Sequence, residues 1–151
     1  MKGQCECGAV RLEIDAPPAV RFFCHCTTCQ QLYRAPFADI TVLWSRRVRV
    51  IEGANQLDYR HYNWLPVSIN RGICRSCRRP VIGHSTIPPM GVSFLPAYVW
   101  GDQDVLPAPL GHLFYHRRVA EIDDGLPKVE GLIASELSAT AWLLPRLLRP
   151  R

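Results

Sequence analysis

Three cysteines within six residues form a dense group of potential metal ligands. They are Cys24, Cys26 and Cys29, and the segment 24–29 has the sequence CHCTTC. Thiolates bind Zn²⁺ well, and a closed structural zinc site has four protein ligands. Three protein ligands leave the fourth position on the metal to water or to a substrate, as in catalytic zinc sites. The segment therefore favours an open zinc site that accepts a small ligand.

Two further cysteine pairs flank this segment along the chain. Cys5 and Cys7 form a CxC pair near the N-terminus, and Cys74 and Cys77 form a CxxC pair about seventy residues later. A CxxC pair is a common half of a structural zinc site, and the two pairs together supply four thiolates. We therefore expect a closed four-cysteine zinc site that holds the start of the chain against its middle.

Other interpretations of the three-cysteine segment stay open at this level. It could be a closed structural site completed by a distant histidine or aspartate, or an open site without a reaction. His25 is expected to point away from the sulfur atoms, because neighbouring side chains of an extended backbone face opposite sides. The remaining histidines are expected at the surface or hydrogen-bonded in the core: His61, His84, His112 and His116.

Disulfide bonds are disfavoured for two reasons. Seven cysteines is an odd number, and the sequence shows no apolar N-terminal segment typical of a secretory signal. We therefore expect a cytoplasmic protein, in which paired cysteines are more often metal ligands than disulfides. The apolar runs are also too short for a membrane-spanning helix.

The composition is that of one globular domain, expected over residues 1–151. The chain is 48% hydrophobic and 21% charged, so it can bury a core without relying on metal alone. The formal net charge is +5, but two zinc ions add four positive charges and seven thiolates add seven negative ones. The resulting charge of about +2 disfavours a nucleic-acid partner. Part of the basic excess is terminal, at Arg146, Arg149 and Arg151.

Short strands are expected to position the cysteines. Alternating or β-branched and aromatic patterns predict strands at 10–15, 20–23, 38–43, 48–52, 57–62, 67–73, 80–84, 92–100, 113–115 and 119–122. Pro96 is expected to reduce part of the run 92–100 to an edge or a bulge. The prolines and glycines between these runs favour turns. The sequence therefore predicts an all-β domain.

One helix is predicted, at residues 135–148. Leu137, Ala141, Leu144 and Leu148 recur at helical spacing, with Ser135 as a candidate cap. Pro145 is expected to disturb the last turn. We expect this short C-terminal helix to pack on the sheet of its own domain, although a homo-oligomer interface is the alternative.

The motifs together resemble the glutathione-dependent formaldehyde-activating enzyme family. The resemblance is carried by the segments GQCECGAV at 3–10, CHCTTC at 24–29, CRSC at 74–77, HLF at 112–114 and DGLP at 124–127. It covers residues 3 to about 131 and implies a β-tent fold, in which short antiparallel sheets surround two zinc sites. It also implies formation of S-hydroxymethylglutathione from glutathione and formaldehyde, a carbon-sulfur lyase activity with a small thiol and an aldehyde as substrates.

The same resemblance implies a role for each cysteine. A structural zinc would be held by Cys5, Cys7, Cys74 and Cys77, and a catalytic zinc by Cys24, Cys26 and Cys29. Two positions depart from the family pattern. Arg78 stands where glycine usually follows the CxxC pair, which predicts a rebuilt turn, and Gln30 stands where a basic residue is common after the three-cysteine segment.

The sequence also suggests where a substrate carboxylate could bind. The candidates are four arginines in the N-terminal third of the chain, Arg21, Arg34, Arg46 and Arg47. The alternative to an enzyme is a non-catalytic, zinc-stabilised module that binds a protein or nucleic acid through its basic edge and its C-terminal segment.

Overall fold

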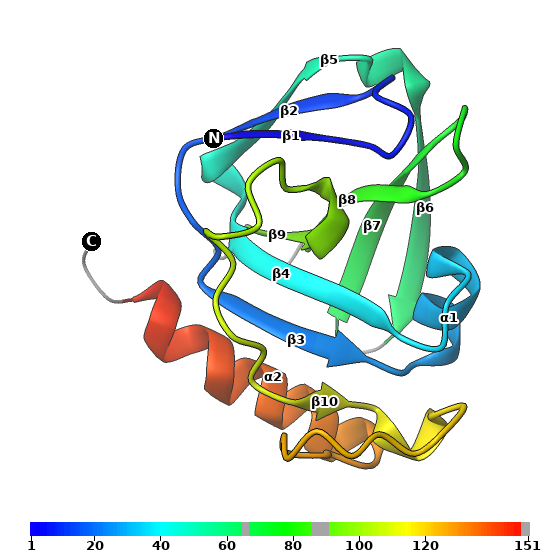
Figure 1. Cartoon of the computed structure of the whole chain (residues 1–151), viewed down its shortest axis with the longest axis vertical. Coiled ribbons are helices and arrows are strands. Elements are labelled where there is room, and N and C mark those ends of the chain that lie inside the picture. Colours follow the sequence, from blue (N-terminus) through cyan, green and yellow to red (C-terminus); the bar gives the residue numbers. More distant parts are fainter. Residues whose placement is uncertain (65–66, 86–90, 149–151) are drawn as a thin grey trace.

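Two sheets and a C-terminal helix make up most of the computed structural model, which describes residues 1–64, 67–85 and 91–148 (Figure 1). The strands are β1 (Lys2–Gln4), β2 (Arg11–Ile14), β3 (Val20–Cys24), β4 (Ala38–Trp44), β5 (Val48–Glu52), β6 (Leu57–Trp64), β7 (Val67–Cys74), β8 (Pro80–Ser85), β9 (Val92–Pro96) and β10 (His112–Leu113). The helices are α1 (Thr27–Tyr33) and α2 (Leu132–Leu147), with 3₁₀ turns η1 (Ser45–Arg47), η2 (Ala54–Gln56), η3 (Ala97–Val99) and η4 (Tyr115–Arg117). Arg149 and Arg151 lie outside the described residues.

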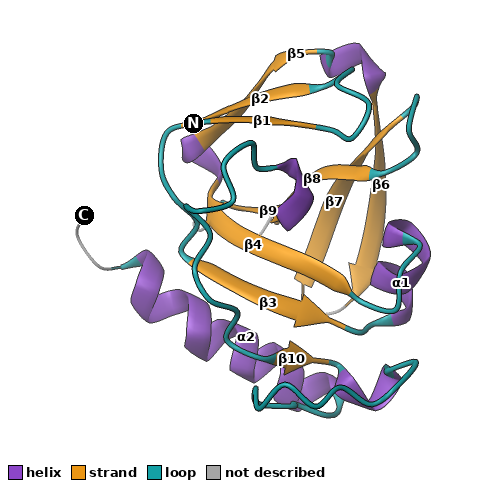
Figure 2. Ribbon diagram, in the orientation of Figure 1, coloured by secondary structure: helices purple, strands orange, loops and turns teal. Residues whose placement is uncertain are grey.

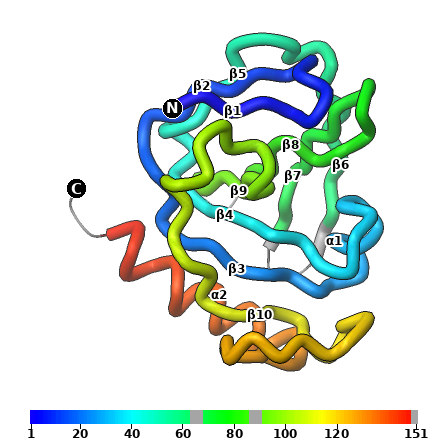
Figure 3. Tube along the Cα trace, viewed as in Figure 1, coloured from blue at the N-terminus to red at the C-terminus, as the bar shows by residue number. Residues whose placement is uncertain are grey.

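The small sheet has the strand order β1-β2-β5, and the large sheet has the order β10-β3-β4-β9-β8-β7-β6. The Cα trace shows the first two strands lying beside β5, although some 30 residues of chain separate β2 from β5 (Figure 3). Pairing is antiparallel except at one edge, where β10 runs parallel to β3 and places Leu113 opposite Cys24. The expected all-β fold with a C-terminal helix is confirmed, and this parallel edge is the exception to the antiparallel sheets.

Two hydrophobic cores lie within this arrangement. The first contains Cys5 and Cys74 together with Leu12, Leu95 and Trp100, from both sheets. The second contains Cys24 and Cys29 and is built on the large sheet, with part of α2 packed against it. Each set of cysteines therefore lies in a core of its own.

The C-terminal helix packs on the large sheet, as expected (Figure 2). Its inward residues are Ala139, Trp142, Leu143 and Leu147, which contact the second core. The indole N–H of Trp44 donates a hydrogen bond to the carbonyl oxygen of Leu147, at 3.2 Å. In the described part of the chain, neither helix is long and apolar enough to cross a membrane.

The buried face of α2 differs from the face that was predicted from the spacing of its apolar residues. Leu137 and Leu148 are 66% and 64% exposed, and Leu144 is also exposed. Apolar residues occur on most sides of this helix, so their spacing does not single out one buried face. The helix also begins at Leu132 rather than at Ser135, whose hydroxyl instead accepts a hydrogen bond from the Phe114 N–H at 2.8 Å.

Three further local features differ from what the sequence predicted. The sequence did not predict α1, which begins after Cys26 because the sulfur of this residue caps the helix by accepting from the Cys29 N–H. The predicted strand at 119–122 is absent from that segment. In this segment the Ile122 N–H donates to the Tyr115 hydroxyl, at 2.8 Å, rather than to the backbone of a neighbouring strand. Helix α2 also continues through Pro145 to Leu147.

Thr41 joins β4 to β9 and to Trp100 in the first core. Its hydroxyl donates to the Leu95 carbonyl oxygen at 2.9 Å and accepts from the Trp100 indole N–H at 2.8 Å. Thr41→Val leaves this buried indole N–H without an acceptor, so we expect the free energy of unfolding to fall by about 1–3 kcal/mol. Urea denaturation followed by tryptophan fluorescence measures the loss.

The control is Thr140→Val, because Thr140 is exposed on α2. Its effect should stay within about 0.5 kcal/mol. Equal losses from the two valine variants would contradict a stabilising role for the buried hydrogen bonds.

Candidate functional site

The four-cysteine cluster has the dimensions of a zinc site. The sulfur atoms of Cys5, Cys7, Cys74 and Cys77 all lie within 4.8 Å of one another. The separations are 3.5 Å between Cys5 and Cys7, and 3.7 Å from Cys74 to each of them. Four sulfurs placed about 2.3 Å from Zn²⁺ in a tetrahedron are about 3.8 Å apart. All seven cysteines are free in the structure.

Turns present the two cysteine pairs to each other. The Val10 N–H donates to the Cys5 sulfur at 3.2 Å, and Gly53 brings the turn between β5 and β6 against this loop. A side chain at Gly53 would place its Cβ 1.9 Å from the Ala9 carbonyl oxygen, so only glycine fits. Arg78 follows Cys77 with φ of 61°, a left-handed conformation that suits glycine better than arginine.

The thiols of this cluster do not ionise equally. Burial raises the pKa of Cys5 to about 12. The pKa of Cys7 is instead lowered to about 7, and the largest cause is a hydrogen bond from the Ala9 N–H. Several thiolates held this close together repel one another and are stable only beside a cation. A divalent metal ion therefore matches the donor set and its geometry.

The three-cysteine cluster is formed by the end of β3 and the first turn of α1. The sulfurs of Cys24, Cys26 and Cys29 lie within 4.8 Å of one another, so they too could hold a metal ion. Hydrogen bonds from the Cys24 and Cys29 thiols lower the pKa of Cys26 to about 3, and the charge of Arg71 contributes to this shift. The cluster therefore holds one thiolate that its two neighbours stabilise.

His25 points away from the sulfurs, as the sequence predicts. Its Nε2 lies 2.8 Å from Nδ1 of His112, and Nε2 of His112 lies 2.7 Å from a carboxylate oxygen of Asp124. Lys128 also donates to Asp124, and these two hydrogen bonds lower the pKa of this carboxyl. The ionised Asp124 accepts from His112, which leaves the other nitrogen of His112 to accept from His25.

The two histidines of this chain of hydrogen bonds are buried, whereas Asp124 lies at the surface. His25 and His112 are 1% and 0% exposed, and burial lowers the pKa of His25 to about 4. His25 is therefore neutral, and its Nδ1 has no hydrogen-bond partner among the described residues. Gln30 also fixes the segment, because its amide donates to the carbonyl oxygens of His25 and Arg117, both at 2.7 Å. The network holds the backbone from which the three sulfurs project.

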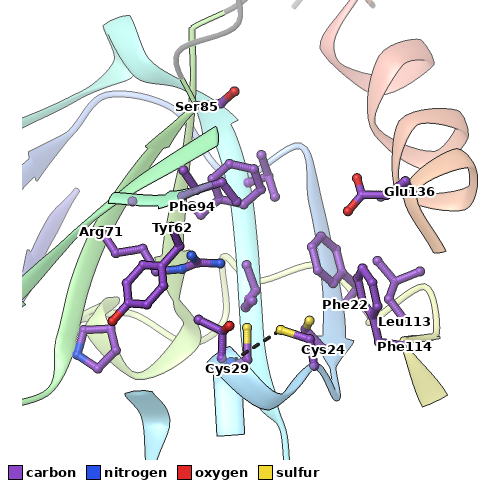
Figure 4. Close-up of a pocket in the computed structure, with 18 of the residues that line it drawn as sticks. Phe22, Cys24, Cys29, Tyr62, Arg71, Ser85, Phe94, Leu113, Phe114 and Glu136 are labelled. Carbon is purple, nitrogen blue, oxygen red and sulfur yellow. Dashed lines mark hydrogen bonds between the residues drawn. The ribbon is translucent and has the colours of Figure 1, made fainter. Parts of the chain in front are cut away.

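A cavity of about 370 Å³ opens beside the three-cysteine cluster (Figure 4). Cys24, Cys26 and Cys29 all line it, whereas the four cysteines of the other cluster lie outside it. Most of the wall is apolar and comes from the large sheet and from α2, including Phe22, Val42, Ile82, Phe94, Leu113 and Leu143. A small molecule in this cavity would contact the cysteines in apolar surroundings.

Two charged side chains reach into the cavity from opposite sides. Arg71 comes from β7 and Glu136 from α2, with Cys24 and Cys29 at the base between them (Figure 4). The guanidinium of Arg71 lies 5.1 Å from the centre of the Tyr62 ring. Burial, followed by the charge of Cys26, raises the pKa of Glu136. The cavity thus presents a guanidinium and a carboxyl group near the sulfur atoms.

The arginines proposed from the sequence do not line this cavity. Arg21 forms two hydrogen bonds with Asp39 instead, at 2.9 and 2.7 Å. Arg46 lies over the Trp44 ring, and Arg47 pairs with an aspartate. Arg34 ends α1 in a left-handed conformation and is exposed.

Sequence reasoning missed Arg71 and Glu136. Arg71 occupies the same face of its strand as Ile69 and Ile73, because side chains alternate along a strand. A lone charge on an apolar strand face was therefore the available signal. Glu136 had no comparable signal, because the face that α2 turns inward was not evident from its sequence.

This chain was compared with models of protein families, with curated proteins and with solved structures. The family model for the glutathione-dependent formaldehyde-activating enzyme matches residues 1–117. A crystal structure of a Rhodobacter sphaeroides protein is similar in fold, with a TM-score of 0.56 and 22% sequence identity. The similarity covers 72% of this chain and 98% of that one. A search of curated proteins found no match.

The buried histidine pair yields a stability prediction. His112→Phe keeps an aromatic ring beside Phe23 and Tyr115 but removes the acceptor for His25 and the donor to Asp124. A buried polar group left without its partner costs about 1–3 kcal/mol, so we expect the free energy of unfolding to fall by that amount. Urea denaturation at pH 7 with metal present measures it.

The matched control is His61→Phe, because His61 is exposed on β6. Its effect should stay within about 0.5 kcal/mol. If His112→Phe is as stable as the control variant, the network does not contribute to holding the three-cysteine segment.

Proposed function

The chain belongs to the glutathione-dependent formaldehyde-activating enzyme family, whose model matches residues 1–117, and we propose that it joins a small thiol to an aldehyde at the three-cysteine cluster. The thiol is glutathione and the aldehyde is formaldehyde, which makes the product S-hydroxymethylglutathione. The observation that carries this proposal is the cavity of about 370 Å³ that all three of these cysteines line.

We further propose that both clusters bind Zn²⁺. Cys5, Cys7, Cys74 and Cys77 form a closed structural site, since four thiolates complete a tetrahedral set. Cys24, Cys26 and Cys29 supply three ligands and leave one position for a substrate. Thiolate ligands favour Zn²⁺ over hard cations such as Mg²⁺ and Ca²⁺, which prefer oxygen.

The reaction adds a thiol across a carbonyl group. Cys24, Cys26 and Cys29 would hold the zinc ion, which would lower the pKa of a bound thiol so that a thiolate is available at neutral pH. The new carbon-sulfur bond forms as the carbonyl π bond opens, and the proton of the thiol ends on the new hydroxyl oxygen. The apolar wall, with Phe22 and Phe94, excludes water that would compete with the thiol for the aldehyde.

Metal stoichiometry tests the two proposed sites. We expect wild type to bind two Zn²⁺ per chain, and Cys26→Ser to bind one while remaining folded. Cys74→Ser should lose the closed site and most of its stability, because a structural zinc contributes about 10–16 kcal/mol in small peptides and whole domains have about 5–15 kcal/mol. Elemental analysis and thermal unfolding measure both effects.

Ser76→Ala is the matched control, since Ser76 lies between Cys74 and Cys77 and is exposed. It should keep two metal ions and the wild-type melting temperature. Fewer than two zinc ions in wild type, or unchanged zinc content in Cys26→Ser, would contradict the assignment.

Exchange spectroscopy by NMR tests the reaction itself. With ¹³C-formaldehyde and glutathione, we expect wild type to exchange free aldehyde with the S-hydroxymethyl adduct at least about tenfold faster than Cys26→Ser does. A tenfold faster rate corresponds to a barrier that is lower by about 1.4 kcal/mol. Cys26→Ser serves as the control because it removes one proposed ligand and leaves the four-cysteine cluster intact. Two bound zinc ions without faster exchange would instead favour a non-catalytic, zinc-stabilised binding module.

A further inference from the structure

The ionisable groups that line the cavity are few. Apart from cysteines and tyrosines, the described lining contains Arg71, Glu136, His116 and Arg117. His116 and Arg117 are exposed in η4, whereas Arg71 and Glu136 are half-buried and point inward (Figure 4). The interior of the cavity therefore has one guanidinium and one carboxyl group.

Arg71 lacks a carboxylate partner within the described part of the chain. It lies over the Tyr62 ring and its charge helps to lower the pKa of Cys26, whereas arginines such as Arg21 and Arg118 are paired with carboxylates. A guanidinium in apolar surroundings gains most from a carboxylate, which it binds through two parallel hydrogen bonds. The ligand group expected at Arg71 is therefore a carboxylate.

Glu136 lacks a cationic partner within the same described residues. Its backbone carbonyl accepts from the Thr140 hydroxyl, but its carboxylate faces the cavity (Figure 4). Burial and the nearby Cys26 charge both disfavour its ionised form and raise its pKa. A ligand ammonium group would compensate this negative charge.

The geometry points to Arg71 and Glu136 as the residues that select the thiol by its charged groups, and this inference rests on the proposed function of the three-cysteine cluster. The sulfur of the ligand lies at the cysteines, its carboxylate pairs with Arg71, and its ammonium group pairs with Glu136. A thiol with a carboxylate alone leaves Glu136 uncompensated, and a thiol with an amine alone leaves Arg71 unpaired. Arg71 and Glu136 are thus the residues that determine thiol specificity.

The selection of the ammonium group is a property of α2. Glu136 lies beyond residues 1–117, which the family model matches, whereas Arg71 lies within them. The cavity volume of about 370 Å³ falls in the usual range of about 300–1,000 Å³ for small-molecule sites. Helix α2 therefore contributes Glu136, the residue proposed to select the ammonium group, to a cavity formed mainly by the large sheet.

The test uses three thiols that differ by one charged group each. They are glutathione, glutaryl-cysteinyl-glycine, which lacks the ammonium group, and 4-aminobutyryl-cysteinyl-glycine, which lacks the neighbouring carboxylate. Isothermal titration calorimetry on the zinc-loaded protein gives the dissociation constants. We expect wild type to bind glutathione about tenfold or more tightly than either analogue, the usual effect of one hydrogen bond to a charged group.

Two variants identify the residue that recognises each group. In Glu136→Gln the preference for the ammonium group should disappear, while the preference for the carboxylate remains. In Arg71→Gln the preference for the carboxylate should disappear, while the preference for the ammonium group remains. The matched controls are Glu52→Gln and Arg11→Gln, because both residues are exposed on the small sheet. Both controls should keep the wild-type preferences.

The outcomes separate this inference from the proposed function. Equal affinity of wild type for all three thiols overturns the inference alone. A uniform loss of affinity in Glu136→Gln, with the preference for the ammonium group retained, also overturns it. If none of the thiols binds to wild type loaded with two zinc ions, both the inference and the proposed function fail.

Discussion

The convergence of Cys5 and Cys7 with Cys74 underlies the rest of the fold. The three sulfurs lie 3.5–3.7 Å apart, although about seventy residues separate the two turns that carry them. Thiols this close can ionise together only beside a cation, so a bound metal would join the loop between β1 and β2 to the end of β7. The first hydrophobic core surrounds this junction and connects the small sheet to the large one.

The three-cysteine cluster depends on a different kind of support. Cys24 and Cys26 face the cavity, while His25 between them points to the opposite side and reaches His112. The parallel pairing of β10 with β3 brings His112 to this position, because it sets Leu113 opposite Cys24. The segment is thus held from behind by a buried hydrogen-bond network, which leaves its sulfurs open to a ligand.

The cavity combines a wall from the sheet with a wall from the helix. Strands from the large sheet supply Arg71 and most of the apolar surface, and α2 supplies Glu136 and Leu143. The family match ends before α2, so the metal-binding segments and the helix wall belong to different parts of the chain. This division lets the charge of the cavity change without altering the cysteines, because the ligand set does not depend on α2.

The sequence by itself determined the two cysteine sets and most of the strands, because both depend on spacing over a few residues. The alternation at 48–52, for example, specifies β5 without reference to distant contacts. Only the tertiary structure decided which face of α2 is buried, that α1 begins at the Cys26 cap, and that His25 meets His112. It also decided that Arg71 and Glu136, rather than the four arginines first considered, face the cavity. These features depend on contacts between residues far apart in the chain, whose geometry is set by the packing of sheets and helix and leaves no periodic signal in the sequence.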